Sequence, residues 1–173
     1  MTDDAPAGED ELSAFWESAR LRAGLGRLAV VVGPGALASV APPAWAFGDD
    51  AEVADDLLAL VLEGIKQATS MTLAEVEAAG ETLPHAGDLG IVLDGAGRPR
   101  ALVRTTQVDV VRFDEVDDAH AALEGEGDGT LAGWRAEHES FWARVLEPLG
   151  LVVDGALLVV LERFELLHPV PGR

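Results

Sequence analysis

The sequence predicts an α+β fold, in which helices pack outside a small, mostly antiparallel sheet or barrel. Helical apolar spacing dominates the first half of the 173-residue chain, and β-branched or apolar runs dominate the second half. Two of these runs follow each other across the turn "DGAGRP", rather than alternating with helices as the strands of parallel sheets do. Close to half of the residues are apolar, which is typical of a globular protein.

The first part of the chain is predicted to contain two helices. Residues 1–9 are acidic and are expected to form a disordered tail. A helix is expected from about Glu11 to Gly24, because apolar residues recur there at helical spacing. Residues 25–47 are loop-like, with a short strand at "LAVVV". The second helix is expected over about 52–63 and is ended by Gly64.

A third, short helix is indicated by a capping signal. Thr72 is followed three residues later by Glu75, which is the capping-box pattern. The residues before it, "KQATSMT", are short and partly β-branched and indicate a strand or turn.

The second half contains three runs that predict strands: "LGIVLDG", "RALVRTTQVDVVRF" and "ALLVVLERFELLH". Between the second and third run lies a helical region. It begins with the acidic "FDEVDDAHAALEGEGDG" and continues with the amphipathic "TLAGWRAEHESFWARVLEPLG". His138 lies on the apolar side of this helix and is expected to be packed and hydrogen-bonded, and Trp134, Phe141 and Trp142 are expected to lie in the core.

Composition and charge exclude several kinds of site. The chain has no cysteine, so disulfides, thiolate catalysis and cysteine-based zinc sites are excluded. Its four histidines form no HxxxH pair, and no metal or cofactor is expected. The net charge of −19 disfavours loose binding to polyphosphates. The apolar stretch 28–47 is broken by "GPG" and "PP", so we expect no membrane span; with an acidic N-terminus in place of a signal peptide, a cytoplasmic protein is expected.

Lys66 is the only lysine among twelve basic residues. It is interpreted either as a solvated lysine at a helix end or as part of a site. If the backbone stays helical past Gly64, Lys66 and Thr69 meet across one turn. A lysine that is partly desolvated loses its proton more easily and then acts as a base toward a hydroxyl nucleophile, which arginine cannot do.

Two further charged positions are candidates. Arg104 shares one face of its predicted strand with Leu102, Thr106, Val108 and Val110, and is either a strand-end residue or a pocket cation that grips a carbonyl, phosphate or base edge.

Glu162 and Arg163 end an apolar run and form either an ion pair with Arg104 or Lys66, or the acid of a site. Trp45 and Phe47 are either core residues or a stacking surface for a flat ligand.

Taken together, "PPAWAFGDDAEVADDLLALVLEGIKQATS", "LPHAGDLGIVLDGAGRPRALVRTTQVDVVRFDEVDDAHAALEGEGDGTLAGWRAEH" and "LVVLERFELLHP" resemble the longer bacterial branch of the ASCH domain family. The resemblance covers roughly residues 42–169, which leaves residues 1–41 as an acidic tail, helix and loop. It rests on the Gly-x-Lys-x-x-Thr pattern that ends at Thr69, on the Gly-Asp at 87–88 and on the Arg-Thr-Thr run. It implies a PUA-like fold, a small β-barrel with flanking helices and a cleft, here with an N-terminal helical extension.

The resemblance also implies the function. We expect a domain that binds RNA or a modified nucleoside in a cleft lined by Lys66, Thr69 and Arg104. The acidic net charge favours a small ligand, so binding is expected to have a short footprint and a shallow salt dependence. The remaining ligand-binding candidates are Gly64, Ser70, Thr105, Thr106, Arg163 and Trp45.

Two alternatives remain. One is a hydrolase, either a ribonuclease or an amidohydrolase of 4-acylated cytidines, in which Thr69 is the nucleophile and Lys66 the base. The glutamate that completes that site in relatives aligns with Arg104, and the nearest acidic candidate here is Glu162. The other is a protein-interaction module, and a homodimer is possible in either case.

Overall fold

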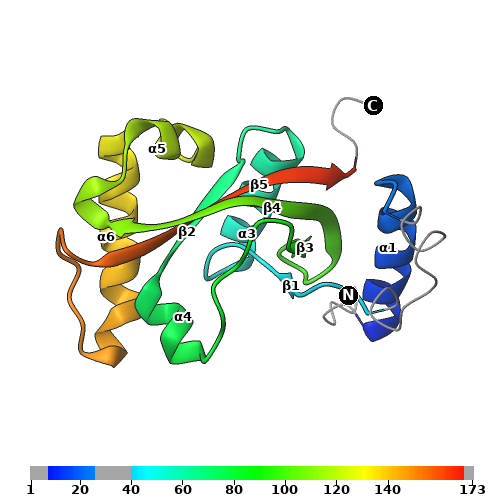
Figure 1. Cartoon of the computed structure of the whole chain (residues 1–173), viewed down its shortest axis with the longest axis horizontal. Helices are drawn as coiled ribbons and strands as arrows, with labels where there is room; N and C mark the ends of the chain where they lie inside the picture. Colours follow the sequence, from blue (N-terminus) through cyan, green and yellow to red (C-terminus); the bar gives the residue numbers. More distant parts are fainter. Residues whose placement is uncertain (1–7, 26–39, 170–173) are drawn as a thin grey trace. The chain divides into compact units, whose positions relative to one another are not determined.

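The computed structural model describes residues 8–25 and 40–169 and confirms the α+β class (Figure 1). The strand expected at 28–32 lies outside the described residues. The elements in order are α1 (Glu9–Arg22), β1 (Ala44–Trp45), α3 (Ala51–Leu62), β2 (Ala68–Thr72), α4 (Leu73–Ala79), β3 (Leu89–Leu93), β4 (Pro99–Arg112), the 3-10 helix η2 (Phe113–Glu115), α5 (Asp118–Glu124), α6 (Leu131–Leu146), the 3-10 helix η3 (Glu147–Leu149) and β5 (Leu158–His168).

The strands form one five-stranded sheet in the order β1-β3-β4-β5-β2. β3 pairs antiparallel with β4, and β2 pairs antiparallel with β5, whereas the two-residue β1 is parallel to β3. The sheet is not closed, which is compatible with a partial barrel and not with a closed one. The long strands β4 and β5 contribute residues to both of the compact units into which the chain divides.

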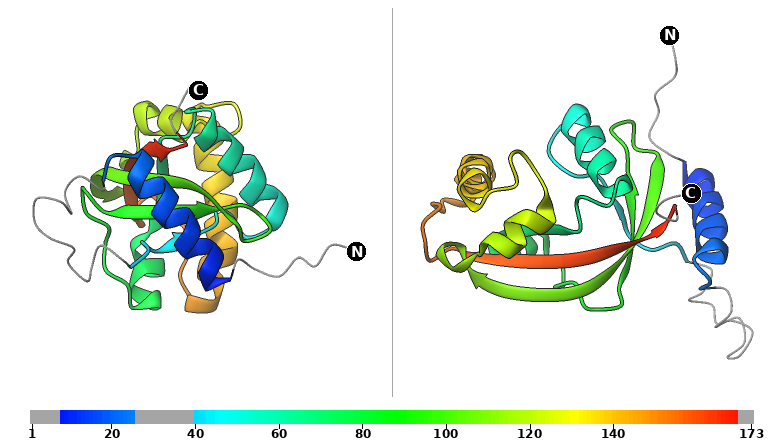
Figure 2. Two further views of the ribbon diagram at one scale, coloured as in Figure 1. Left: turned by 90° about the vertical axis from the view of Figure 1, so that its right-hand side faces the viewer. Right: turned by 90° about the horizontal axis from the view of Figure 1, so that it is seen from above.

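The first unit comprises residues 1–64, 89–104 and 165–173. Within it, α1 packs through Trp16 and Ala19 on Ile91 of β3 and Leu102 of β4 (Figure 2). All four side chains are buried, so this contact removes apolar surface from water and stabilises the unit.

The second unit comprises residues 65–88 and 105–164 and contains β2, α4, α5 and α6. Its core forms where α5 and α6 cover one face of the strands (Figure 2). The buried core residues are Phe113, Val116, Ala121, Trp134, Trp142, Leu146, Val159 and Leu161. Trp134 and Trp142 are therefore core residues as predicted, and Phe141 is partly buried against them.

Local sequence signals determine where several helices begin and end. The Asp50 side chain caps α3 by accepting a hydrogen bond from the Val53 backbone N–H. Gly64 follows the end of α3 with φ +75°, a left-handed conformation that stops the helix. Thr72 and Glu75 form the predicted capping box at the start of α4.

The strand β4 departs from simple alternation. Its first half is buried on both faces, because Ala101, Leu102 and Val103 are all nearly inaccessible to solvent. Farther along, Thr105 is buried whereas Thr106 is exposed. The residues expected to share one face with Arg104 and Thr106 therefore differ in solvent exposure, from buried Leu102 to exposed Thr106.

Candidate functional site

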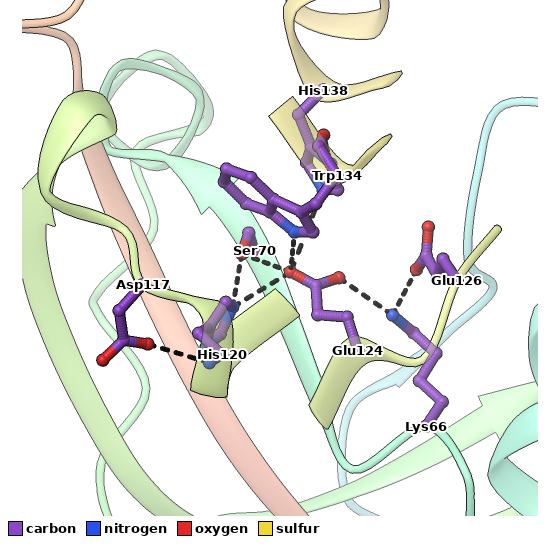
Figure 3. Close-up of polar contacts among 8 residues, drawn as sticks. All are labelled: Lys66, Ser70, Asp117, His120, Glu124, Glu126, Trp134 and His138. Carbon is purple, nitrogen blue, oxygen red and sulfur yellow. Dashed lines mark hydrogen bonds and ion pairs between the residues drawn. The ribbon is translucent and has the colours of Figure 1, made fainter. Parts of the chain in front are cut away.

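Lys66 lies in the second unit, between α3 and β2, and its side chain is almost completely buried, with 1% of its surface exposed. The interpretation of Lys66 as a solvated lysine was therefore wrong. Its ammonium donates to Glu124 Oε2 at 3.1 Å and forms an ion pair with Glu126 (Figure 3). A compact ammonium group suits this place between two carboxylates better than a planar guanidinium does.

Glu124, the last residue of α5, is the centre of the polar network in Figure 3. Its Oε1 atom accepts from Ser70 Oγ at 2.5 Å, from Trp134 Nε1 at 2.8 Å and from His120 Nε2 at 3.0 Å. These donors come from β2, α6 and α5, so one buried carboxylate joins three elements of the second unit. Both oxygens of the buried carboxylate are therefore satisfied, which stabilises its place in the network.

The surroundings of Glu124 determine its charge. Burial alone raises the pKa of this carboxyl. The Lys66 ammonium opposes that effect, and the His120 hydrogen bond, the nearby His138 and the Ser70 hydroxyl act in the same direction as Lys66. The net result is a pKa for Glu124 well below its usual range, so the carboxylate is ionised at neutral pH.

Ser70 and His120 lie close together but do not form a nucleophile and a base. Ser70 Oγ is 2.8 Å from His120 Nε2, which is also 3.0 Å from the ionised Glu124 Oε1. That nitrogen must carry a proton in order to face a carboxylate oxygen, so it has no lone pair with which to accept the serine proton. The buried Nδ1 atom of His120 has no hydrogen-bond partner in the described structure. This geometry favours a structural role for Ser70.

His138 was expected to be packed and hydrogen-bonded, and this prediction is confirmed. Its Nδ1 atom lies 2.9 Å from the Trp134 carbonyl oxygen, and its ring stacks on Trp134 with centroids 4.1 Å apart. His138 Nε2 lies 3.9 Å from Glu124 Oε1, at the edge of the network.

Thr69 lies on the opposite face of β2 from Ser70, because successive side chains of a strand alternate. The helical turn that would bring Thr69 to Lys66 does not form, since α3 ends before Gly64 and β2 begins at Ala68. Thr69 instead pairs in register with Glu162 of β5, which places their side chains on the same face. The structure thus groups Lys66 with Ser70, and Thr69 with Glu162.

Glu162 is buried, with 8% of its surface exposed, and accepts a hydrogen bond from Thr105 Oγ1 at 2.5 Å. Burial raises the pKa of Glu162; the Thr105 hydroxyl lowers it by a smaller amount, and the negative charge of Asp88 raises it further. Among the residues that the structure describes, no basic side chain forms an ion pair with Glu162. The expected ion pair with Arg104 or Lys66 is therefore not formed.

The other predicted site residues have separate surroundings. Arg104 donates to Glu165 at 2.8 Å through Nε and again through a terminal nitrogen, and both side chains are about half exposed. Thr106 donates to the Arg163 backbone carbonyl at 3.1 Å, so this contact does not involve the Arg163 guanidinium.

Trp45 and Gly64 belong to the first unit. The Trp45 ring covers Gly90 so closely that a Cβ atom there would lie 2.0 Å from it. Trp45 also contacts Phe47 edge to face, at 6.5 Å between ring centroids. The role of Gly64 is conformational, at the end of α3.

Neither a metal-ligand cluster nor a membrane-spanning helix occurs among the described residues. Residues 8–25 and 40–169 contain no group of three or more His, Cys, Asp or Glu side chains that could hold a metal ion. Across the same ranges, no helix has the length and the apolar character needed to cross a bilayer.

Sequence reasoning missed His120, Glu124 and Glu126, which it placed in an acidic helical segment. The i, i+4 spacing of His120 and Glu124 within "AHAALE" was a usable signal, because it puts both side chains on the mostly apolar face of a short helix. A buried carboxylate requires a cation, and the only lysine of the chain was a natural candidate.

The family model for the ASCH domain matches residues 43–168 of this chain. The chain belongs to the ASCH domain family. ASCH domains have a PUA-like fold, which is associated with RNA binding. No protein of curated function matches the chain in sequence.

Two solved ASCH structures are similar to this chain. A crystal structure from Enterococcus faecalis V583, assigned to family DUF984, shares 30% sequence identity with a TM-score of 0.74, over 92% of this chain and 91% of that one. The crystal structure of an ASCH domain from Lactobacillus crispatus JV V101 shares 29% identity with a TM-score of 0.71, over 87% of this chain and 94% of that one. The similarity extends beyond the matched domain into the N-terminal region.

Proposed function

We propose that this ASCH domain binds single-stranded RNA or a modified nucleoside, and that Glu162 recognises the base. The observation that carries the proposal is the Glu162 carboxyl itself, which is buried and has a hydroxyl but no cation as its partner in the described structure. A buried carboxylate without a cation is unfavourable unless another donor satisfies it. The exocyclic amino group of cytosine is such a donor, and glutamate accepts from it in nucleic-acid complexes.

The neighbours of Glu162 support this reading. Thr69 lies beside it on the same face, and Thr105 holds one of its oxygens. Hydroxyls donate and accept, so they suit the edge of a base. The net charge of −19 disfavours a long phosphate track, which leaves a short ligand held by its base as the better fit.

The basic residues around β4 do not offer an alternative phosphate surface. Arg100 is paired with Asp94, Arg104 with Glu165, and Arg112 with Asp114. Each guanidinium is already matched by a carboxylate, so the concentration of arginines in this stretch does not make it a positively charged track.

Fluorescence anisotropy with short labelled oligocytidine and oligouridine tests the proposal. We expect the wild-type protein to prefer oligocytidine, and Glu162→Gln to reduce that preference about tenfold, within the ~1–3 kcal/mol typical of one base-edge contact. Glu81→Gln, which removes a charge from an exposed position, is the matched control. An unchanged preference in Glu162→Gln, or an affinity that falls steeply with salt, refutes the proposal.

A second candidate is hydrolysis of a 4-acylated cytidine. It is favoured by the register that puts the Thr69 hydroxyl beside Glu162, whose raised pKa suits a general acid or base. Lys66 is not the base in this version, because its ammonium contacts Glu124 and Glu126, whereas Thr69 pairs in register with Glu162. We expect Thr69→Val and Glu162→Gln each to reduce product formation by about 100-fold or more. Wild-type protein that leaves acylated cytidines intact excludes this candidate.

A further inference from the structure

The two carboxylates that contact the Lys66 ammonium, those of Glu124 and Glu126, differ in burial and in their number of hydrogen bonds. Glu124 is 1% exposed and accepts three further hydrogen bonds, so it has no freedom to leave. Glu126 is 19% exposed, and its ion pair with Lys66 is the only interaction of its carboxylate in the described structure. Figure 3 shows the ammonium between the two acids. Of these two carboxylates, Glu124 is held in place and Glu126 is the one that can be displaced.

The backbone that carries Glu126 is closely fitted. Gly125 and Gly127, on either side of it, have φ values of +64° and +54°. A Cβ atom on Gly125 would lie 2.6 Å from the Ile65 side chain, and one on Gly127 would lie 2.7 Å from the Glu137 carboxylate. The backbone therefore holds Glu126 in a defined place beside Lys66.

We propose that Lys66 is a binding residue for a phosphate group, and that Glu126 occupies the phosphate position until the ligand displaces it. A phosphate oxygen and a carboxylate oxygen make the same kind of contact with an ammonium, and lysine is a common phosphate ligand in proteins. Glu124 stays in place and keeps the ammonium oriented when Glu126 leaves. The proposal does not depend on Glu162 of β5. Glu162 pairs with Thr69, so its side chain lies on the opposite face of the sheet from Ser70 and its partner Glu124.

The charge of Glu126 also determines how tightly a phosphate binds to the Lys66 ammonium. With both glutamates present, two negative charges face one positive charge, and a further anion is repelled. Removing the Glu126 charge takes away one of these two negative charges and leaves Glu124 in place. We therefore expect Glu126→Gln to bind inorganic phosphate about tenfold more tightly than the wild type, which corresponds to about 1.4 kcal/mol.

The experiment uses the full chain and its single lysine. Protein labelled with 13C at lysine Cε gives one side-chain signal, which reports directly on Lys66 as inorganic phosphate is added at constant ionic strength. The matched control is Glu139→Gln, which removes one negative charge from an exposed position of α6. The titration contains inorganic phosphate and no nucleoside, so its failure is distinguishable from failure of the proposed function.

The expected result is a saturable shift of the Lys66 signal, at about tenfold lower phosphate concentration in Glu126→Gln than in the wild type and in Glu139→Gln. Glu126→Ala, which removes the whole side chain, is expected to show the same gain. The proposal is overturned if the folded Glu126 variants show no phosphate-dependent shift, or if Glu139→Gln gains as much affinity as Glu126→Gln.

Discussion

Replacing Lys66 by methionine tests the central role of the buried ion pair. Methionine has a similar length, so the main change is the loss of the ammonium at a site that is 1% exposed. Glu124 then keeps its three hydrogen bonds but loses its cation, whereas Glu126, being 19% exposed, turns toward water. Removing one partner of a buried pair costs about 3–5 kcal/mol. We expect a value near 3 kcal/mol, because the remaining donors still stabilise the carboxylate.

Urea unfolding followed by circular dichroism measures this change, with an unchanged m-value as the sign that the folded state stays compact. Arg104→Met is the control: it removes a cation from the half-exposed pair with Glu165 and is expected to cost less than about 1 kcal/mol. The double variant Lys66→Met/Glu124→Gln is expected to be more stable than Lys66→Met, because it removes the unpaired charge as well.

Lys66→Met is also expected to change how the free energy of unfolding depends on pH in acid. The pKa of Glu124 in the folded protein lies below the ordinary value of 4.5, so its ionised form stabilises the fold above about pH 4.5. That stability is lost as the pH falls toward the depressed pKa, by up to ~1.4 kcal/mol per pH unit for one proton. Without the ammonium the pKa rises, and the slope below pH 4.5 is expected to be shallower. Lys66→Met with wild-type stability and an unchanged acid slope would refute the reasoning.

Three further changes test other features by urea unfolding. Glu162→Gln is expected to stabilise the protein at pH 7 and to lose this advantage below about pH 4.5, because the raised pKa of Glu162 means that folding disfavours its charged form. Thr72→Ala is expected to cost about 1 kcal/mol through loss of the helix cap, with Thr72→Ser close to wild type; equal losses in both would rule out the hydroxyl as the cause. Gly125→Ala is expected to lower the free energy of unfolding clearly more than Gly129→Ala does, because both glycines have a similar positive φ but only Gly129 has open space around it. Equal losses of ~1 kcal/mol would mean that the contact of Gly125 with Ile65 is unimportant.

The sequence was sufficient where the signal is local. Thr72 and Glu75 are three residues apart, so the capping box follows from the chain alone and is confirmed. The apolar spacing around Trp134 and Trp142 likewise predicted the buried face of α6. In each case, the residues that make the contact lie within one or a few turns of the same element.

Prediction failed where the contact spans a long stretch of chain. Lys66 and Glu124 are 58 residues apart, and nothing in the spacing of either identifies the other. Gly64 has a left-handed conformation that ends the helix before Lys66. Lys66 and Thr69 therefore do not meet across a helical turn: Lys66 contacts Glu124, and Thr69 pairs with Glu162. The error with Arg104 was of another kind: the acid that binds it is Glu165, three residues beyond the glutamate that was expected.

The position of Lys66 explains why one lysine persists in a chain whose other cations are arginines. An arginine there would bring a broad, planar group with five donors into a space where the ammonium already touches two carboxylates. Its extra N–H groups would need acceptors, but Glu124 Oε1 is already taken by Ser70, His120 and Trp134. An unsatisfied buried donor costs about 1–3 kcal/mol. These contacts of Glu124 thus favour lysine over arginine at this position, whether or not a phosphate ever replaces Glu126.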